Sequence, residues 1–194
     1  MILIRAFIAI AISNNIRKCC QGLSFHLQKM RLKGKFLQPE SIHLTLKFLG
    51  NIHQERVLEI TEVLGRIALK KAPFLLHIRG CGVFTHSNMA RVIWVGIRPS
   101  SSLSNMQEAI EEHLVDKGFS SEKRKYSPHL TLARLTSKNN FEELLNFLRT
   151  KTARKDLGSM WVESVHVYQS ILKSGGAKYK QLATVRLRNG TRMD

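Results

Sequence analysis

Two short stretches of this chain repeat the same four residues, His-Leu-Thr-Leu. The first occupies residues 43–46 and the second residues 129–132, and in each a serine stands two positions before the histidine. Successive side chains of a β-strand point to opposite faces, so the histidine and threonine share one face and the two leucines share the other. Chance alternation is the alternative interpretation, but the shared serine and the apolar run after each copy favour a paired site.

The segments around the two copies follow one order of predicted elements, which is helix, strand, helix and two strands. This order indicates an internal duplication at the level of supersecondary structure. Apolar spacing and turn residues predict the following elements: strands over 2–11, 41–50, 74–80, 91–97, 127–135, 160–171 and 178–187; helices over 54–70 and 103–117, one after Asn14 or Asn15, and one after Asn140.

The expected fold is α+β, with two lobes related by a pseudo-two-fold axis. Each lobe is a mostly antiparallel sheet with helices outside, and the motifs face each other across a central cleft. Without a flexible linker between the lobes, we expect one bilobal domain over residues 1–187. The polar residues 188–194 are expected to form a frayed tail.

Positive charge dominates the composition, with 31 lysines and arginines against 14 acidic residues and a net charge of +17. Such an excess favours an anionic partner such as RNA, although a merely soluble surface is the alternative. Basic residues gather within 29–35 and at 123–125, which we expect to contact RNA phosphates. Aromatic residues make up 7% of the chain, and this content predicts no conspicuous stacking array.

Three cysteines, Cys19, Cys20 and Cys81, form no paired spacing and indicate reduced thiols. The apolar N-terminal stretch is interrupted by Arg5 and has no basic region before it, which argues against a signal peptide. It is also too short to span a bilayer. We therefore expect a buried first strand, a cytoplasmic location and no membrane partner, and the chain is expected to be a monomer.

Two imidazoles that share one site suit general acid–base catalysis, because each titrates near neutral pH. Cleavage of a phosphodiester needs a base for the nucleophile and an acid for the leaving alkoxide. The hydroxyls of Thr45 and Thr131 can donate to phosphate oxygens. Catalytic roles are therefore expected for His43 and His129.

A nearby arginine would stabilise the negative charge of the transition state. Arg134 is a candidate, but strict alternation puts it on the face opposite His129, so it reaches the site only if the strand twists, bulges or ends. Lys47 is a weaker candidate, because alternation puts it on the face of His43.

The paired motifs resemble those of the 2H phosphoesterase superfamily, which is named for two His-x-Thr/Ser-x motifs. The similarity is to the bacterial and archaeal RNA 2′,3′-cyclic phosphodiesterases, also called 2′-5′ RNA ligases, and it covers nearly the whole chain. The segments that carry it are Arg5–Ala9, Pro39–Gly50, Arg91–Gly96 and Pro128–Arg134. Paired motifs in this context are specific, whereas either motif alone is a weak signal.

The resemblance implies metal-independent chemistry without a cofactor, in which 2′,3′-cyclic phosphates at RNA ends are opened to 2′-phosphates. Some relatives also join tRNA halves through 2′-5′ linkages. It also implies that Thr45, Thr131 and Arg134 bind the phosphate. By the same resemblance, His43 acts as the acid and His129 as the base.

Two other classes of protein compete with this interpretation. A metallophosphoesterase would need clustered ligands, and the remaining six histidines show no spacing typical of a ligand set. A non-catalytic RNA- or nucleotide-binding module could use the same cleft, but binding alone needs no pair of titrating groups. Turnover in excess chelator would exclude a metallophosphoesterase, and retained binding without turnover of any cyclic phosphate would favour the binding module.

Overall fold

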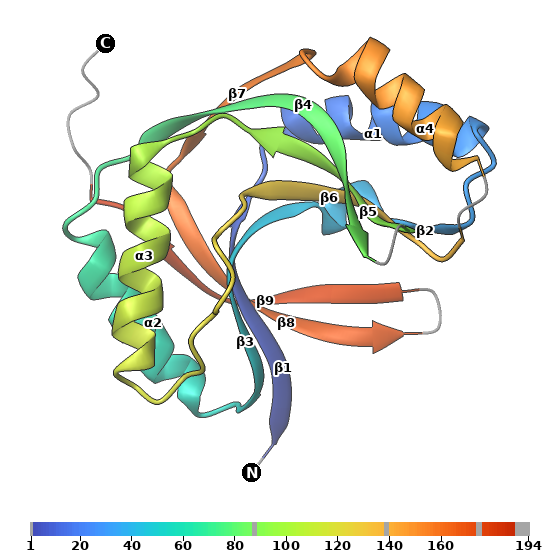
Figure 1. Cartoon of the computed structure of the whole chain (residues 1–194). Coiled ribbons are helices and arrows are strands. Elements are labelled where there is room, and N and C mark those ends of the chain that lie inside the picture. Colours follow the sequence, from blue (N-terminus) through green and yellow to red (C-terminus); the bar gives the residue numbers. More distant parts are fainter. Residues whose placement is uncertain (1, 87–88, 138–139, 174–175, 189–194) are drawn as a thin grey trace.

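The computed structural model describes residues 2–86, 89–137, 140–173 and 176–188 (Figure 1). Within these residues nine strands form one hydrogen-bonded sheet, in the order β7-β4-β5-β6-β3-β1-β8-β9, and β2 pairs with β6 outside this path. All of the pairings are antiparallel. The strands are β1 (Leu3–Ala11), β2 (Gly34–Phe36), β3 (His43–His53), β4 (Phe74–His86), β5 (Met89–Ile97), β6 (His129–Leu135), β7 (Asp156–Val162), β8 (Ser164–Lys173) and β9 (Gly176–Arg186).

The sheet consists of two halves that meet at one place. Strands β3, β1, β8 and β9 form one half, and β7, β4, β5 and β6 form the other. Between β3 and β6 the register contains one residue pair, Leu44 with Leu130. The expected α+β fold with two antiparallel lobes is therefore confirmed, but the lobes are joined into one continuous sheet rather than forming two separate sheets.

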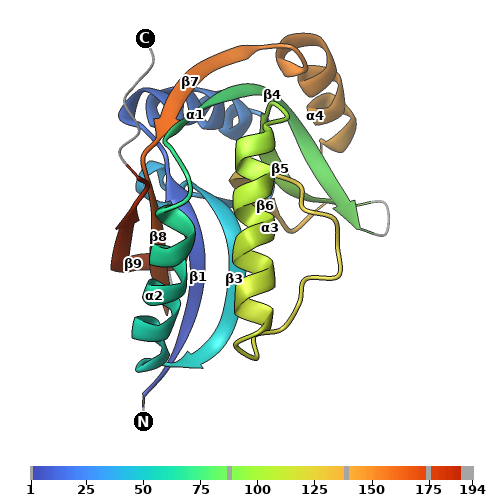
Figure 2. The ribbon, with the colours of Figure 1, turned by 90° about the vertical axis from the view of Figure 1, so that its left-hand side faces the viewer.

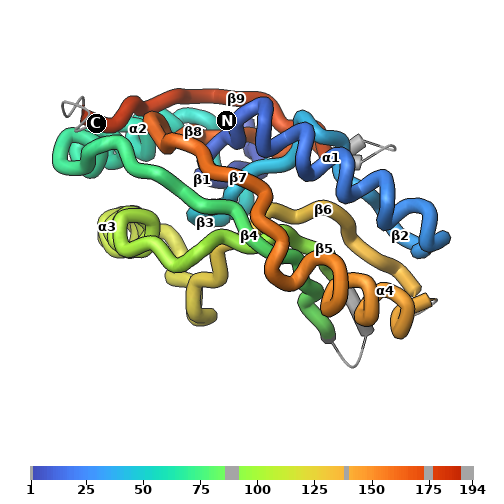
Figure 3. Tube along the Cα trace, turned by 90° about the horizontal axis from the view of Figure 1, so that it is seen from above, coloured from blue at the N-terminus to red at the C-terminus, as the bar shows by residue number. Residues whose placement is uncertain are grey.

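Four α-helices cover the sheet in the described part of the chain: α1 (Asn14–Lys29), α2 (Arg56–Ala68), α3 (Ser101–Val115) and α4 (Phe141–Phe147). Figure 2 shows α2 and α3 running side by side along β1 and β3. Figure 3 shows α1 and α4 toward the other end of the molecule. A 3₁₀ turn, η1 (Pro39–Ser41), precedes β3, and a π-helical turn, η2 (Leu148–Thr152), extends α4.

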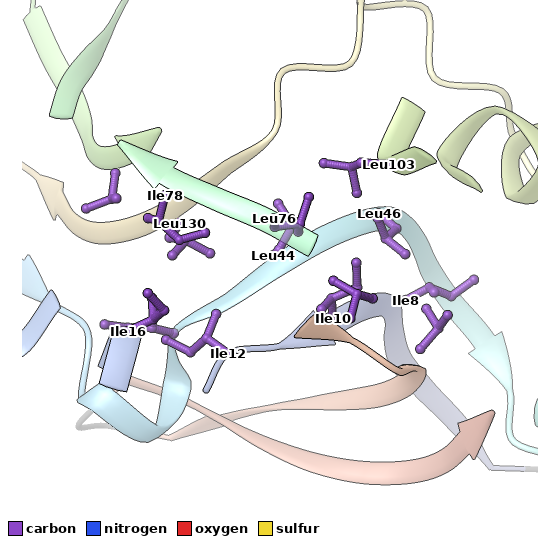
Figure 4. Close-up of a cluster of buried hydrophobic side chains, with 14 of the residues drawn as sticks. Ile8, Ile10, Ile12, Ile16, Leu44, Leu46, Leu76, Ile78, Leu103 and Leu130 are labelled. Carbon is purple, nitrogen blue, oxygen red and sulfur yellow. The ribbon is translucent and has the colours of Figure 1, made fainter. Parts of the chain in front are cut away.

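The hydrophobic core lies against the leucine face of the two motif strands. Leu44, Leu46 and Leu130 are at most 3% exposed and contact the same core cluster as Ile8 and Leu103 (Figure 4). Burying a leucine side chain stabilises a fold by roughly 1.5–3 kcal/mol, so this packing fixes which face of each strand points outward. The histidines and threonines are consequently held on the opposite face.

Several local expectations differ from the structure. The hydroxyl of Ser13, rather than the side chain of Asn14 or Asn15, caps α1 by accepting a hydrogen bond from the amide of Ile16. Asn140 precedes α4 with a φ of 57° and makes no side-chain cap, because its amide donates to the carbonyl of Met30. The strand predicted over 160–171 is two strands, β7 and β8, and the short β2 was missed.

The connection between the strands predicted over 74–80 and 91–97, and that between the strands predicted over 160–171 and 178–187, lie partly outside the described residues; residues 189–194 of the predicted tail lie wholly outside them. The backbone amide of Arg188 donates to the carbonyls of Ala68 and Lys71, at 3.0 Å in each case. This residue, which we expected to be frayed, is therefore attached to the loop after α2.

Candidate active site

The junction between the two half-sheets brings the two motifs together. Leu44 pairs with Leu130 in antiparallel register, so His43 stands one residue before this pair on β3 and Thr131 one residue after it on β6; Thr45 and His129 are related to the pair in the same way. All four side chains are partly exposed on the face opposite the leucines. The motifs therefore lie on neighbouring strands, at the place where the two halves of the sheet meet.

Both motif strands contain an irregularity at the same position. In β3, Thr45 pairs with Ala9 and Lys47 with Ile8, so Leu46 is an extra residue relative to β1. In β6, Thr131 pairs with Trp94 and residue 133 with residue 93, so Leu132 is extra relative to β5. A bulge of this kind shifts the alternation of the residues that follow it. The equivalent bulges agree with the expected internal duplication.

The bulge brings Arg134 to the site face. Leu132 and Ala133 are both fully buried, and Arg134 after them is exposed, on the face of His129 and Thr131. The same shift makes the prediction for Lys47 wrong: Lys47 is 4% exposed on the core face. Phe48 follows Lys47 and occupies the position in the first motif that corresponds to Arg134 in the second.

Each catalytic candidate is held by a carbonyl of its own motif. The distance from Nδ1 of His43 to the carbonyl oxygen of Ser41 is 2.8 Å, and that from Nδ1 of His129 to the carbonyl oxygen of Ser127 is 2.7 Å. A carbonyl oxygen can only accept, so each Nδ1 must carry the proton and donate it. Nε2 of each ring is therefore the atom that can exchange a proton with substrate.

The surroundings favour the neutral form of both rings. The pKa of His43 is lowered to about 4, mainly by burial and in smaller part by the charges of Arg134 and His129, against the opposing effect of the hydrogen bond to Ser41. Burial and the charge of Arg134 also lower the pKa of His129, against the effect of its hydrogen bond to Ser127. An anion bound beside the rings would oppose both effects and raise these pKa values.

Aromatic side chains from distant parts of the chain contact both rings. Phe7 stacks on His43 with 4.7 Å between ring centroids, and Tyr179 meets the same imidazole edge-on at 4.9 Å. Phe84 meets His129 edge-on at 4.9 Å and contacts Trp94 at 5.3 Å. The expectation that no aromatic array is present was therefore wrong, because overall content does not show how residues cluster.

The indole ring of Trp94 occupies the space that a side chain at residue 82 would need. A Cβ atom added at Gly82, which pairs with Trp94 on β4, would come within 2.3 Å of the indole ring. Trp94 also pairs with Thr131 on its other side. Gly82 therefore makes room for an aromatic ring beside the second motif. Trp94 was not identified as a site residue from the sequence. The only sequence signal for it was the family resemblance of residues 91–96, which include it.

A polar network ties the loop before the second motif to the first motif. The hydroxyl of Tyr126 donates to the carbonyl of Thr45 at 3.0 Å. The ammonium of Lys47 is 2.7 Å from Oε1 of Glu111 on α3 and 2.8 Å from the carbonyl of Ser120. Oε1 of Glu111 also accepts from the amide of Glu122. Residues 120–126 are thus fixed against β3 at both ends.

The remaining predictions concern the two basic runs, metal ligands and membrane-spanning helices. Lys123, Arg124 and Lys125 are exposed in the loop before β6, and the basic residues of 29–35 are exposed from the end of α1 into β2. Among the described residues, no group of three or more His, Cys, Asp or Glu side chains could hold a metal ion. None of the helices in the described ranges is long and apolar enough to cross a bilayer.

Comparison with known proteins identifies the family of this geometry. The family model of the 2′-5′ RNA ligase superfamily matches residues 22–171. A protein of Methanothermobacter thermautotrophicus named RNA 2′,3′-cyclic phosphodiesterase is 30% identical over 184 residues, which is 95% of this chain and 99% of that protein. A protein of the same name from Aeropyrum pernix is 34% identical over 160 residues, or 82% of this chain and 89% of that protein.

Solved structures show the same fold. A crystal structure of a Thermus thermophilus protein superposes with a TM-score of 0.80 at 23% identity, covering 95% of this chain and 98% of that one. The structure of Escherichia coli LigT complexed with 3′-AMP gives a TM-score of 0.77 at 23% identity, covering 96% of this chain and 99% of that one. On the family model and the curated relatives, this chain belongs to the 2′-5′ RNA ligase superfamily, whose members include RNA 2′,3′-cyclic phosphodiesterases.

Proposed function

We propose that this protein hydrolyses the 2′,3′-cyclic phosphate at an RNA end to a 2′-phosphate, without a metal or cofactor. The observation that carries the proposal is the pair of motifs on neighbouring strands, each with a histidine whose free Nε2 is available on one shared face. The curated relatives support the choice of substrate through their name, RNA 2′,3′-cyclic phosphodiesterase. The net charge of +17 suits a polyanionic substrate.

In the proposed reaction, one imidazole removes a proton from water while the water oxygen attacks phosphorus. The bond from phosphorus to the 3′ oxygen breaks, and the second imidazole donates a proton to that oxygen. Thr45 and Thr131 donate to the non-bridging oxygens, and the guanidinium of Arg134 stabilises their developing charge. The product carries a 2′-phosphate and a 3′-hydroxyl. An RNA 5′-hydroxyl in place of water would join two ends by a 2′-5′ linkage, as for two tRNA halves.

The two histidines can be divided between these roles in either way. The resemblance assigns His43 as the acid and His129 as the base, and we retain this division as the proposal. In the protein without substrate, the pKa of His43 is lowered to about 4, which favours the reverse division because an acid must first be protonated. Binding of the substrate's negative charge would therefore have to raise the pKa of His43 before it could act as acid.

The decisive experiment uses adenosine 2′,3′-cyclic phosphate in excess chelator and identifies the monophosphate that forms. We expect adenosine 2′-phosphate. His43→Ala and His129→Ala should each lower the rate by roughly 10² to 10⁴, which is typical for loss of a positioned acid or base. His113→Ala is a matched control, because His113 also places Nδ1 near a backbone carbonyl but lies exposed on α3.

A substrate with a better leaving group than the 3′ alkoxide would separate the two roles. It needs little protonation as it departs, so it should rescue the variant that lacks the acid and not the variant that lacks the base. Rescue of His129→Ala alone would reverse the proposed division. RNA binding without turnover of any cyclic phosphate would instead make this protein a binding module and overturn the proposal.

A further inference from the structure

A second cation lies directly beside Arg134 on the same face of the sheet. Strand β2 pairs with the outer part of β6, on the edge that β3 uses at Leu130, and Lys35 is the partner of Arg134 in this register (Figure 1). Paired residues of neighbouring strands point to the same face. Both side chains are exposed, so two positive groups stand next to each other just beyond the histidine pair.

The neighbouring positive charges have no counter-ion among the described residues. The ion pairs within the described ranges are Lys47 with Glu111 and Arg56 with Glu59, so neither Lys35 nor Arg134 takes part in one. Like charges directly opposite each other destabilise a sheet. This arrangement is therefore unfavourable in the empty protein, and it becomes favourable when anions lie over the two strands.

The two cations stand in different relations to the catalytic pair. Arg134 lies on β6, the strand that carries His129 and Thr131, and its charge lowers the pKa of both His43 and His129, whereas Lys35 lies on the neighbouring strand β2. Arg134 is therefore placed for the reacting phosphate, and Lys35 for a second anion farther along the site. In RNA that ends in a 2′,3′-cyclic phosphate, the nearest second anion is the phosphate on the 5′ side of the terminal nucleoside.

We propose that Lys35 forms a subsite for the phosphodiester on the 5′ side of the terminal nucleoside. This inference rests on the proposed function and makes its substrate class more specific: the protein recognises the end of an RNA strand, not only a mononucleotide. Lys35 binds the preceding phosphate while Arg134 and the two motifs hold the cyclic phosphate. Strand β2, which carries Lys35, is thereby part of the RNA-binding surface.

The test compares three substrates for the wild type and Lys35→Gln. These are adenosine 2′,3′-cyclic phosphate, the same nucleotide with a 5′-phosphate, and the dinucleotide ApA ending in the cyclic phosphate. We expect Lys35→Gln to lower kcat/KM about two- to fivefold at low salt for the two substrates that carry the 5′ phosphate, the size typical of an exposed ion pair. Turnover of the substrate without it should not change.

The matched control is Lys29→Gln, which removes the same charge from the same basic run. The proposal narrows the earlier expectation for this run, because it assigns the phosphate of a dinucleotide to Lys35 alone. Lys29 belongs to α1, and its ammonium lies over the ring of Phe25 at 4.5 Å from the centroid. For a single strand, the logarithm of affinity falls with the logarithm of salt concentration by about 0.7 per phosphate contact. Lys35→Gln should therefore reduce this slope by about 0.7 for the dinucleotide, and Lys29→Gln should leave it unchanged.

Binding of the dinucleotide with a 2′-phosphate end, measured by calorimetry, tests the subsite independently of turnover. If the wild type opens no cyclic phosphate, the proposed function fails, yet weaker binding by Lys35→Gln than by Lys29→Gln would still support the subsite. Equal effects of the two variants would overturn the subsite. Loss of turnover of all three substrates in Lys35→Gln would also overturn it, because Lys35 would then act at the reacting phosphate itself.

Discussion

Protonation of His43 should make the folded protein less stable, by an amount that follows from its surroundings. The ring is partly buried against Phe7 and lies near Arg134, and its pKa falls from 6.5 to about 4. In the unfolded chain the same imidazole takes up a proton near pH 6.5. Its contribution to stability is therefore fully present above pH 6.5 and is lost as the pH falls toward 4. At about 1.4 kcal/mol per pKa unit, the loss at pH 4 is about 3 kcal/mol.

Urea unfolding followed by circular dichroism at pH 7, 5.5 and 4 would measure this loss. Other groups titrate in the same range, so the informative quantity is the difference between the wild type and His43→Gln. The free energy of unfolding of the wild type should fall by about 3 kcal/mol more than that of the variant between pH 7 and pH 4. His113→Gln should follow the wild type. Parallel pH curves for the wild type and His43→Gln would refute the argument. Inorganic phosphate should reduce the difference, because an anion beside the ring raises its pKa.

The remaining predictions concern the network and the basic loop. Lys47→Ala should destabilise the protein by about 3 kcal/mol in urea unfolding, because Glu111 is left partly buried without its partner. The double variant Lys47→Met with Glu111→Gln should lose clearly less stability. Equal losses in the two proteins would contradict a buried ion pair. Tyr126→Phe removes the hydrogen bond to the first motif and should cost about 1 kcal/mol, with kcat falling more than KM rises; an unchanged kcat would argue against a positioning role. Replacing residues 123–125 together with alanine should weaken RNA binding and flatten its salt dependence, while turnover of a mononucleotide stays unchanged; an unaltered slope in anisotropy titrations would exclude this loop as a contact.

The polar faces of the two motifs could be predicted because alternation is a local property. Each polar residue of the two motifs is next to a leucine that the core must bury, and this fixes the direction of its side chain. The residues are His43, Thr45, His129 and Thr131. The fold class followed from the order of elements around each copy. Arg134 could be predicted only conditionally, since a bulge is a feature of strand pairing and has no fixed signature in the alternating pattern.

Other features depended on contacts between distant parts of the chain. Because of the bulge at Leu46, the side chain of Lys47 points toward α3 and forms an ion pair with Glu111. Simple alternation along the strand could not indicate this contact. The aromatic rings around the histidines come from β1, β4, β5 and β9, so no window of sequence contains them together. Strand β2 has three residues, which is too short for alternation to be recognised, although it carries Lys35 beside the site.

The equivalent bulges have a consequence for the direction in which a substrate enters. Two identical motifs would form a site with true two-fold symmetry, and a phosphate with its chain could then bind in either of two opposite orientations. After the bulge, however, one motif presents the exposed ring of Phe48 and the other the guanidinium of Arg134. One end of the site is therefore apolar and the other is cationic, so the base and the backbone of a nucleotide have different preferred ends. Two equivalent motifs thus frame a site with a direction, and under the proposed function we expect the substrate to bind in one orientation.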